Sequence, residues 1–164
     1  MPCLWSARTT STCNPLPQYP AGIDRLAAAA GEIDVLVNNA GHAVWAPTEE
    51  TKVSDYDAMF AGTVRAAFLV VAAFALATAA KGSGNVINIG SMAGSLGLAT
   101  GAAYGATKAA PASMTQGWAA EYSGRGVRFD TVAPGPVSTR LPPVPPRPGP
   151  MLRTCSTPSA GPLR

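Results

Sequence analysis

A tyrosine and a lysine stand four positions apart in the segment AAYGATKAA, which covers residues 102–110. Positions i and i+4 share one face of a helix, so Tyr104 and Lys108 are expected to point in the same direction. A free phenol titrates at about pH 10, too high for acid–base work near neutral pH, and a neighbouring ammonium group lowers that pKa by favouring the phenolate. The pair could therefore act as a general acid–base, although a solvated helix face shows the same spacing by chance.

Three short apolar runs end in turn residues, and each predicts a parallel strand. The first run fits a strand buried on both faces, the second a further buried strand, and the third a strand that ends at Pro134. The runs are DVLVNNAG at 34–41, NVINIGS at 85–91 and VRFDTVAPG at 127–135. Helical stretches at 54–80 and 101–123 alternate with these runs, and residues 21–31 predict the last turns of a preceding helix. Strands and helices that alternate with short joins predict an α/β fold with right-handed crossovers. Such a sheet binds ligands at the carboxyl ends of its strands.

Cap residues mark the limits of the first long helical stretch. Ser54 is a candidate N-cap, acidic residues follow in the first turn, and Gly82 lies just past the helical pattern. The longest uncharged part of this stretch has 15 residues, between Arg65 and Lys81. A membrane span needs about 20 residues, so we expect a buried helix and no membrane partner.

Both ends of the chain differ in composition from the middle. Residues 1–20 contain four prolines without a periodic apolar pattern, and residues 141–164 contain eight prolines. Proline removes a backbone donor and breaks helices and central strands. We therefore expect an irregular segment at 1–20, a domain at 21–140, and a Pro-rich, disordered tail at 141–164.

Charge and cysteine content limit the class of protein. The formal net charge is +3, but residues 21–140 hold eight Lys and Arg against nine Asp and Glu. The middle of the chain therefore offers no basic patch for a nucleic acid. The three cysteines, Cys3, Cys13 and Cys155, lie in the two ends and lack the spacing of metal ligands. We expect no metal site, no secretory signal and a cytoplasmic location.

Four motifs in register resemble the short-chain dehydrogenase/reductase family. The family's N-N-A-G matches residues 38–41, and its serine matches Ser91, 13 positions before Tyr104. Its Y-x-x-x-K matches Tyr104 and Lys108, and its P-G-x-x-x-T matches Pro134, Gly135 and Thr139. The resemblance implies an incomplete Rossmann-type doubly wound parallel sheet with three recognisable strands and crossover helices, within residues 21–140.

The resemblance also implies an activity. It is an NAD- or NADP-dependent oxidoreduction, in which hydride passes between nicotinamide and a small-molecule alcohol or carbonyl substrate. Tyr104 would be the acid–base, Lys108 would lower its pKa and contact the nicotinamide ribose, and Ser91 would hold the substrate oxygen. The implied cofactor-binding residues are Asn38, Ala40 and Gly41 on the adenosine side, Pro134, Gly135 and Thr139 near the nicotinamide amide, and Tyr104 with Lys108.

Three departures from the family pattern leave an alternative open. Thr63 stands where the family has an asparagine that organises a relay water, and Asp130 replaces another asparagine. The family's T-G-x-x-x-G-x-G turn, which places the pyrophosphate at a helix N-terminus, is absent from the sequence. The alternative is a catalytically inactive truncated remnant or a subunit-interaction module. In either case the helices near 54–80 and 101–123 could form a homo-oligomer with a partner subunit.

Overall fold

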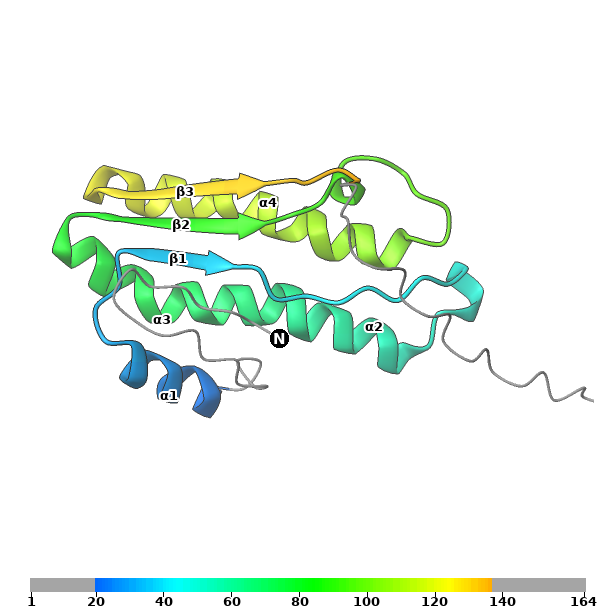
Figure 1. Ribbon diagram of the computed structural model, residues 1–164, viewed down its shortest axis with the longest axis horizontal. Coiled ribbons are helices and arrows are strands. Elements are labelled where there is room, and N and C mark those ends of the chain that lie inside the picture. Colours follow the sequence, from blue (N-terminus) through cyan, green and yellow to red (C-terminus); the bar gives the residue numbers. More distant parts are fainter. Residues whose placement is uncertain (1–19, 137–164) are drawn as a thin grey trace, which may run out of the picture.

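A single parallel sheet forms the centre of the protein, seen in a computed structural model that describes residues 20–136. Its strands are β1 (Val35–Asn38), β2 (Gly84–Ile89) and β3 (Val127–Val132), in the spatial order β1-β2-β3 (Figure 1). The three predicted strands and their parallel direction are confirmed. The predictions for residues 1–19 and 137–164, which include Thr139, lie outside the described residues.

The helices connect the strands as crossovers on one side of the sheet. They are α1 (Pro20–Ala30), α2 (Val53–Phe60), α3 (Ala66–Lys81) and α4 (Ala102–Tyr122). A π-helical turn, η2 (Ala61–Arg65), joins α2 to α3 without a break. Short 3-10 turns are η1 (Thr48–Glu50), η3 (Met92–Gly94) and η4 (Ser123–Arg125). Figure 1 shows α3 and α4 running alongside the layer of strands.

The long helix begins and ends at residues that only partly match the prediction. Lys52, not Ser54, is the N-cap residue, because the Lys52 carbonyl accepts hydrogen bonds from the backbone N–H groups of Asp55 and Tyr56 at 3.0 Å. Ser54 therefore lies inside the first turn, and its prediction as a cap was wrong. The expected end is confirmed: Gly82 caps α3 with φ of 77°, a left-handed conformation that glycine adopts without steric cost.

The continuous helix Val53–Lys81 is longer than its uncharged core. It has 29 residues, and by length and composition alone it could cross a membrane. This is weak evidence, because a core helix of a folded domain meets the same criterion. Here Val70, Val71 and Phe74 of this helix are buried in the core.

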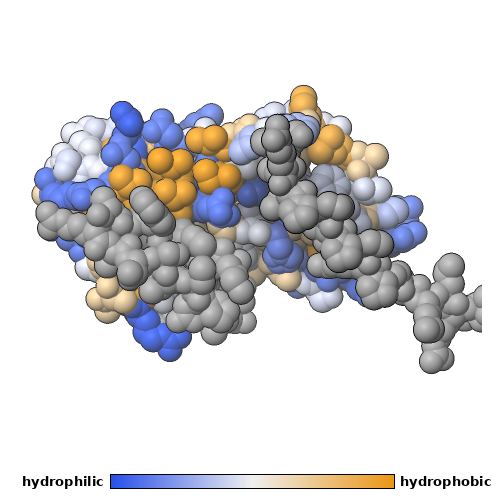
Figure 2. Space-filling view, in the orientation of Figure 1, coloured by the Kyte–Doolittle hydropathy of each residue, from blue (hydrophilic) through white to orange (hydrophobic). Residues whose placement is uncertain are grey.

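The two faces of the sheet have different surroundings. We call the side under the helices the covered face; its side chains from Leu36, Val86, Asn88, Val127 and Phe129 are at most 7% exposed. They pack against Ile23 of α1, Val71 of α3 and Trp118 of α4. The opposite side, which we call the open face, carries the alternate residues Val35, Val37, Ile87, Arg128, Asp130 and Val132. These are half-buried or exposed, and Figure 2 shows an apolar patch over the strands on this side.

The expectation of burial on both faces is therefore met on one face only. Within residues 20–136, α1, α3 and α4 all pack on the covered face. The alternation is clearest in β3, where Val127 and Phe129 are buried while Arg128 and Asp130 are exposed. Those two charged side chains pair with each other at 3.2 Å along the strand.

A polar network joins the carboxyl half of the sheet to α4. Asn38 Nδ2 donates to Asn88 Oδ1 at 2.8 Å, which links β1 to β2. Asn88 Nδ2 and the Thr131 hydroxyl each donate to Thr115 Oγ1 at 2.8 Å, and Thr115 in turn donates to the Pro111 carbonyl. Asn88 is fully buried, so these bonds satisfy groups that water cannot reach. The network fixes the strand ends relative to α4.

Candidate active site

Tyr104 and Lys108 lie one turn apart in the first half of α4, as predicted. Lys108 is only 7% exposed, and its Nζ donates to the carbonyl of Ile89, the last residue of β2, at 2.9 Å. Burial lowers the pKa of Lys108, because a desolvated ammonium group loses its hydration. Tyr104 is half-buried. The helix thus places one buried cation and one accessible phenol beside the end of the central strand.

The segment that follows β2 approaches α4 so closely that only glycine fits at two positions. A Cβ on Gly105 would lie 2.6 Å from the Ala93 carbonyl oxygen, and a Cβ on Gly94 would lie 2.9 Å from the backbone of Lys108 and Ala109. The missing side chain of Gly105 thus admits this backbone. Ser91 begins the turn η3, where its Oγ accepts a hydrogen bond from the Ala93 N–H at 3.2 Å. The close packing brings Ser91 to the same end of the sheet as Tyr104 and Lys108.

The segment after β3 joins the same region. The Met92 N–H donates to the Pro134 carbonyl at 3.0 Å, and a Cβ on Gly135 would lie 3.9 Å from the Met92 sulfur. Pro134 and Gly135 therefore lie next to the residue that follows Ser91.

Gly41 forms a small cradle with Thr63 and Lys108. A Cβ at Gly41 would lie 3.1 Å from Thr63 Oγ1 and 3.4 Å from Lys108 Nζ. Thr63 belongs to the π-helical turn and is 3% exposed, and its Oγ1 has no hydrogen-bond partner among the described residues. An unpaired buried hydroxyl costs free energy, so the cradle fits a ligand that carries hydroxyl groups. The ribose of a nicotinamide cofactor has this chemistry, whereas the sequence lacks the glycine-rich turn that would hold its pyrophosphate.

Asn38 and Ala40 lie at the end of β1 and in the segment after it. The Asn38 amide nitrogen already donates to Asn88, so this side chain ties two strands together. Ala40 is half-buried beside Gly41. The structure thus gives Asn38 a structural contact in addition to the cofactor-binding role expected of it.

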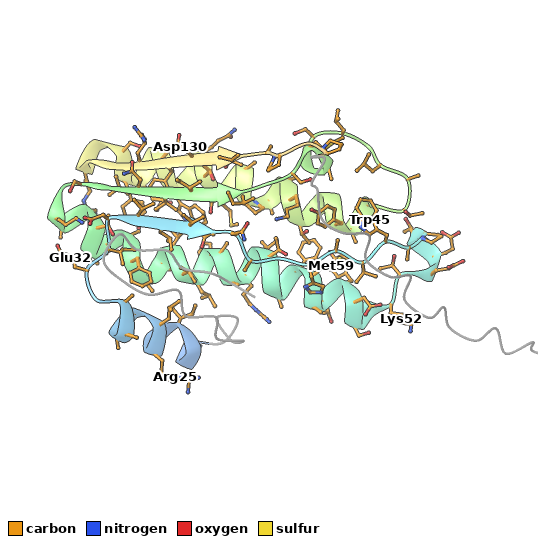
Figure 3. The ribbon with its side chains drawn as sticks, viewed as in Figure 1. Arg25, Glu32, Trp45, Lys52, Met59 and Asp130 are labelled. Atoms are coloured by element: carbon orange, nitrogen blue, oxygen red, sulfur yellow. The ribbon has the colours of Figure 1, made fainter. Side chains whose placement is uncertain are left out.

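Sequence reasoning missed Trp45, which lies against Tyr104. The two ring centroids are 5.3 Å apart at an interplanar angle of 46°, and Trp45 is 50% exposed. Figure 3 labels Trp45 on the segment after β1, on the side where α4 begins. No periodicity marks this residue. Its only sequence signal is an aromatic side chain close behind the N-N-A-G run.

Two hollows lie beside this region. One, of about 440 Å³, is lined by Thr48, Thr51, Val53, Tyr56, Ala102, Ala103 and Ala106. The other, of about 690 Å³, is lined by Asp57, Phe60, Ala61, Val64, Arg65, Phe68 and Met114. Both are formed mainly by helices α2 and α4 and the π-helical turn. Neither hollow is lined by Ser91, Tyr104 or Lys108.

The parallel sheet with its crossover helices is a Rossmann-type fold, the class of fold that binds nucleotide cofactors. Residues 15–143 match the short chain dehydrogenase family. The chain belongs to this family, and its curated relatives include oxidoreductases.

Curated relatives and solved structures agree with this assignment. The chain is 38% identical over 121 residues to the D-threitol dehydrogenase of Mycolicibacterium smegmatis, covering 74% of this chain and 46% of that protein. It is 39% identical over 119 residues to the inactive 2-(S)-hydroxypropyl-CoM dehydrogenase 2 of Xanthobacter autotrophicus, covering 73% and 50%. A crystal structure of a gluconate 5-dehydrogenase from Burkholderia cenocepacia in complex with NADP and tartrate aligns with a TM-score of 0.67 at 37% identity, covering 73% and 47%. The chain spans about half the length of these relatives.

Proposed function

We propose that the protein is an NAD- or NADP-dependent oxidoreductase that interconverts a small secondary alcohol and its ketone. One observation supports the proposal most directly: the backbone of Ala93 and Gly94, two to three residues after Ser91, contacts the helix that carries Tyr104 and Lys108, and Lys108 Nζ lies at the Gly41 cradle. The family membership supports the reaction class. We expect the protein to act in the cytoplasm.

In the direction of oxidation, Tyr104 acts in its phenolate form and accepts the proton of the substrate hydroxyl. A bound nicotinamide cofactor supplies the acceptor for the hydride that leaves the carbinol carbon. The O–H and C–H bonds break, the C=O bond forms, and the proton is held on the Tyr104 oxygen. Reduction runs through the same groups in reverse, with Tyr104 as the acid.

Ser91 and Lys108 support this proton transfer. The Ser91 hydroxyl accepts from Ala93 N–H, so its own proton is available to the substrate oxygen. The Lys108 ammonium would stabilise the Tyr104 phenolate and hold the hydroxyl groups of a ribose placed over Gly41. Pro134, Gly135 and Thr139 would receive the nicotinamide amide, and Asn38 with Ala40 would line the adenosine side.

Replacement of the catalytic hydroxyl tests the proposal. Tyr104→Phe should lower the turnover of a secondary alcohol by about a hundredfold to ten-thousandfold, because it removes only the group that moves the proton. Tyr122→Phe is the matched control, since Tyr122 lies at the other end of α4 and packs against Phe129. Its turnover should equal that of the parent. Turnover by Tyr104→Phe within a few-fold of the parent would remove Tyr104 from the mechanism.

A second candidate function is an inactive subunit-interaction module. Phe68 and Leu76 project from α3 with 51% and 63% exposure, and one relative at 39% identity is itself named inactive. Titration with NADH and NADPH separates the two: saturation at micromolar cofactor favours the oxidoreductase, and the absence of saturation at millimolar cofactor favours the module.

A further inference from the structure

Apolar side chains form a rim near Tyr104, at the start of α4. Trp45 contacts the phenol ring and leaves half of its own surface to solvent. Leu96 and Leu98 lie on the segment between β2 and α4 and are 56% and 36% exposed. Figure 2 shows apolar surface over this segment. Exposed apolar side chains that gather beside a reactive group indicate a binding surface.

Backbone contacts hold Trp45 in this position. The N–H of Ala46, the next residue, donates to the Thr100 carbonyl at 3.1 Å, and the N–H of Val44, the preceding residue, points to the Met59 sulfur at 3.3 Å. Met59 is fully buried. The indole is therefore anchored on both sides by segments that belong to the folded core.

Gly101 brings Trp45 and Leu98 into one surface. A Cβ on Gly101 would lie 2.6 Å from Cζ3 of Trp45 and 3.2 Å from Cβ of Leu98. The two apolar side chains thus flank the same point at the start of α4, three residues before Tyr104. A larger residue at position 101 would push the indole away from this surface.

The side chains of the rim offer no hydrogen-bond partner to a substrate hydroxyl. Ser91 and Tyr104 are the polar side chains expected to meet the reacting oxygen, and the rim itself consists of Trp45 and Leu98. A further substrate hydroxyl buried against the rim would be unpaired, at a cost of about 1–3 kcal/mol each. A flat apolar substituent there gains about 25 cal/mol per Å² of buried surface instead. At this rim the balance disfavours a hydroxyl and favours an apolar substituent.

We propose that the substrate is a secondary alcohol or ketone whose carbinol carbon carries an aryl or other flat apolar substituent, and that Trp45 selects it by packing against this substituent. This inference rests on the proposed function, since it places the reacting oxygen at Tyr104. It separates the chain from its relatives, one of which is named for the polyol D-threitol.

Ligand-detected NMR tests the inference without cofactor or turnover. The probes are 1-phenylethanol and D-threitol, each titrated against the full chain with saturation transfer as the readout. We expect 1-phenylethanol to saturate with transfer strongest at its phenyl protons, and D-threitol to bind at least tenfold more weakly. Trp45→Ala should weaken 1-phenylethanol binding at least tenfold. Phe68→Ala, which removes an aromatic side chain of matched exposure (51% against 50%) that lies on α3 against Trp118, should leave binding unchanged.

Each outcome supports or overturns the role of Trp45 in substrate binding. Equal loss in Trp45→Ala and Phe68→Ala, equal affinity for the two probes, or no saturation by 1-phenylethanol overturns the assignment of Trp45. Failure of this inference can be distinguished from failure of the proposed oxidoreductase function. A chain that oxidises D-threitol faster than 1-phenylethanol keeps the oxidoreductase and loses this inference. A chain that binds 1-phenylethanol at Trp45 but never binds NADH or NADPH keeps the apolar site and loses the oxidoreductase.

Discussion

The covered and open faces of the sheet are made by alternate residues of the same three strands, yet they differ in how completely they are packed. Leu36 and Val127 of the covered face are each 1% exposed, whereas the Arg128 and Asp130 side chains of the open face are 75% and 52% exposed. The helix that carries Tyr104 and Lys108 packs on the covered face. The helix that carries the two candidate catalytic residues is therefore held by the packed layer, on the side away from the open face.

The largest expected difference between the faces is in side-chain packing. Phe129→Ala on the covered face should lower the free energy of unfolding by about 3–5 kcal/mol, because it leaves a cavity against Trp118 and Tyr122. Ile87→Ala on the open face should cost about 1 kcal/mol, since its side chain is only half-buried. Urea unfolding followed by circular dichroism measures both. Equal losses would show that the open face is packed as tightly as the covered one.

The polar network at the strand ends should give an intermediate effect. Thr115→Val keeps the shape of the side chain but removes the acceptor for Asn88 and Thr131. The Nδ2 group of the fully buried Asn88 would then lack its acceptor, at a cost of about 1–3 kcal/mol in the same unfolding experiment. Thr78→Val is the matched control, because the Thr78 hydroxyl donates to the Phe74 carbonyl of its own helix. A loss in Thr78→Val as large as that in Thr115→Val would contradict a special role for the network.

The smallest effect should appear in the pH dependence of stability. Folding lowers the pKa of Lys108 below its ordinary value of 10.5, so the unfolded chain binds more protons between the two values. In that window the free energy of unfolding contributed by Lys108 rises with pH, and below it the cost of burying the ammonium group is fully present.

Lys108→Met should remove this rise. The free energy of unfolding of the parent should therefore increase relative to that of the variant as the pH rises toward 10.5. Arg128→Met removes one positive charge from the open face and controls for net charge. Its curve should run parallel to that of the parent. Parallel curves for the parent and Lys108→Met would show that burial does not shift the pKa of Lys108.

The sequence allowed the elements to be predicted because their patterns are local. The apolar runs at 34–41 and 127–135 contain the observed strands β1 and β3, and β2 begins at Gly84, one residue before the run 85–91. The turn residues that end each run lie at the edge where we expect a ligand to bind. Tyr104 and Lys108 share a helix because their spacing depends on helical geometry alone. Gly82 could be predicted as a C-cap for the same reason.

The remaining features depend on contacts between distant segments. An apolar strand looks the same whether one or both of its faces are covered, so the open face could not be foreseen. The π-helical turn that places Thr63 beneath Gly41 leaves no signal in the residues Ala61–Arg65. Trp45 meets Tyr104 across 59 positions of sequence, through a loop whose path is set by Met59 and Thr100. The roles of the site residues remain predictions, while the fold and family are confirmed.

The contact between Trp45 and Tyr104 also makes Trp45 a fluorescent probe of the site. A tyrosinate absorbs at longer wavelength than a tyrosine and overlaps the emission of a nearby indole. With ring centroids 5.3 Å apart, ionisation of Tyr104 would quench the fluorescence of Trp45. Trp118 lies among Phe68 and Phe129 near the other end of α4, and its replacement by phenylalanine would remove a background signal from the folded domain. The protonation state of the phenol could then be followed in the resting protein.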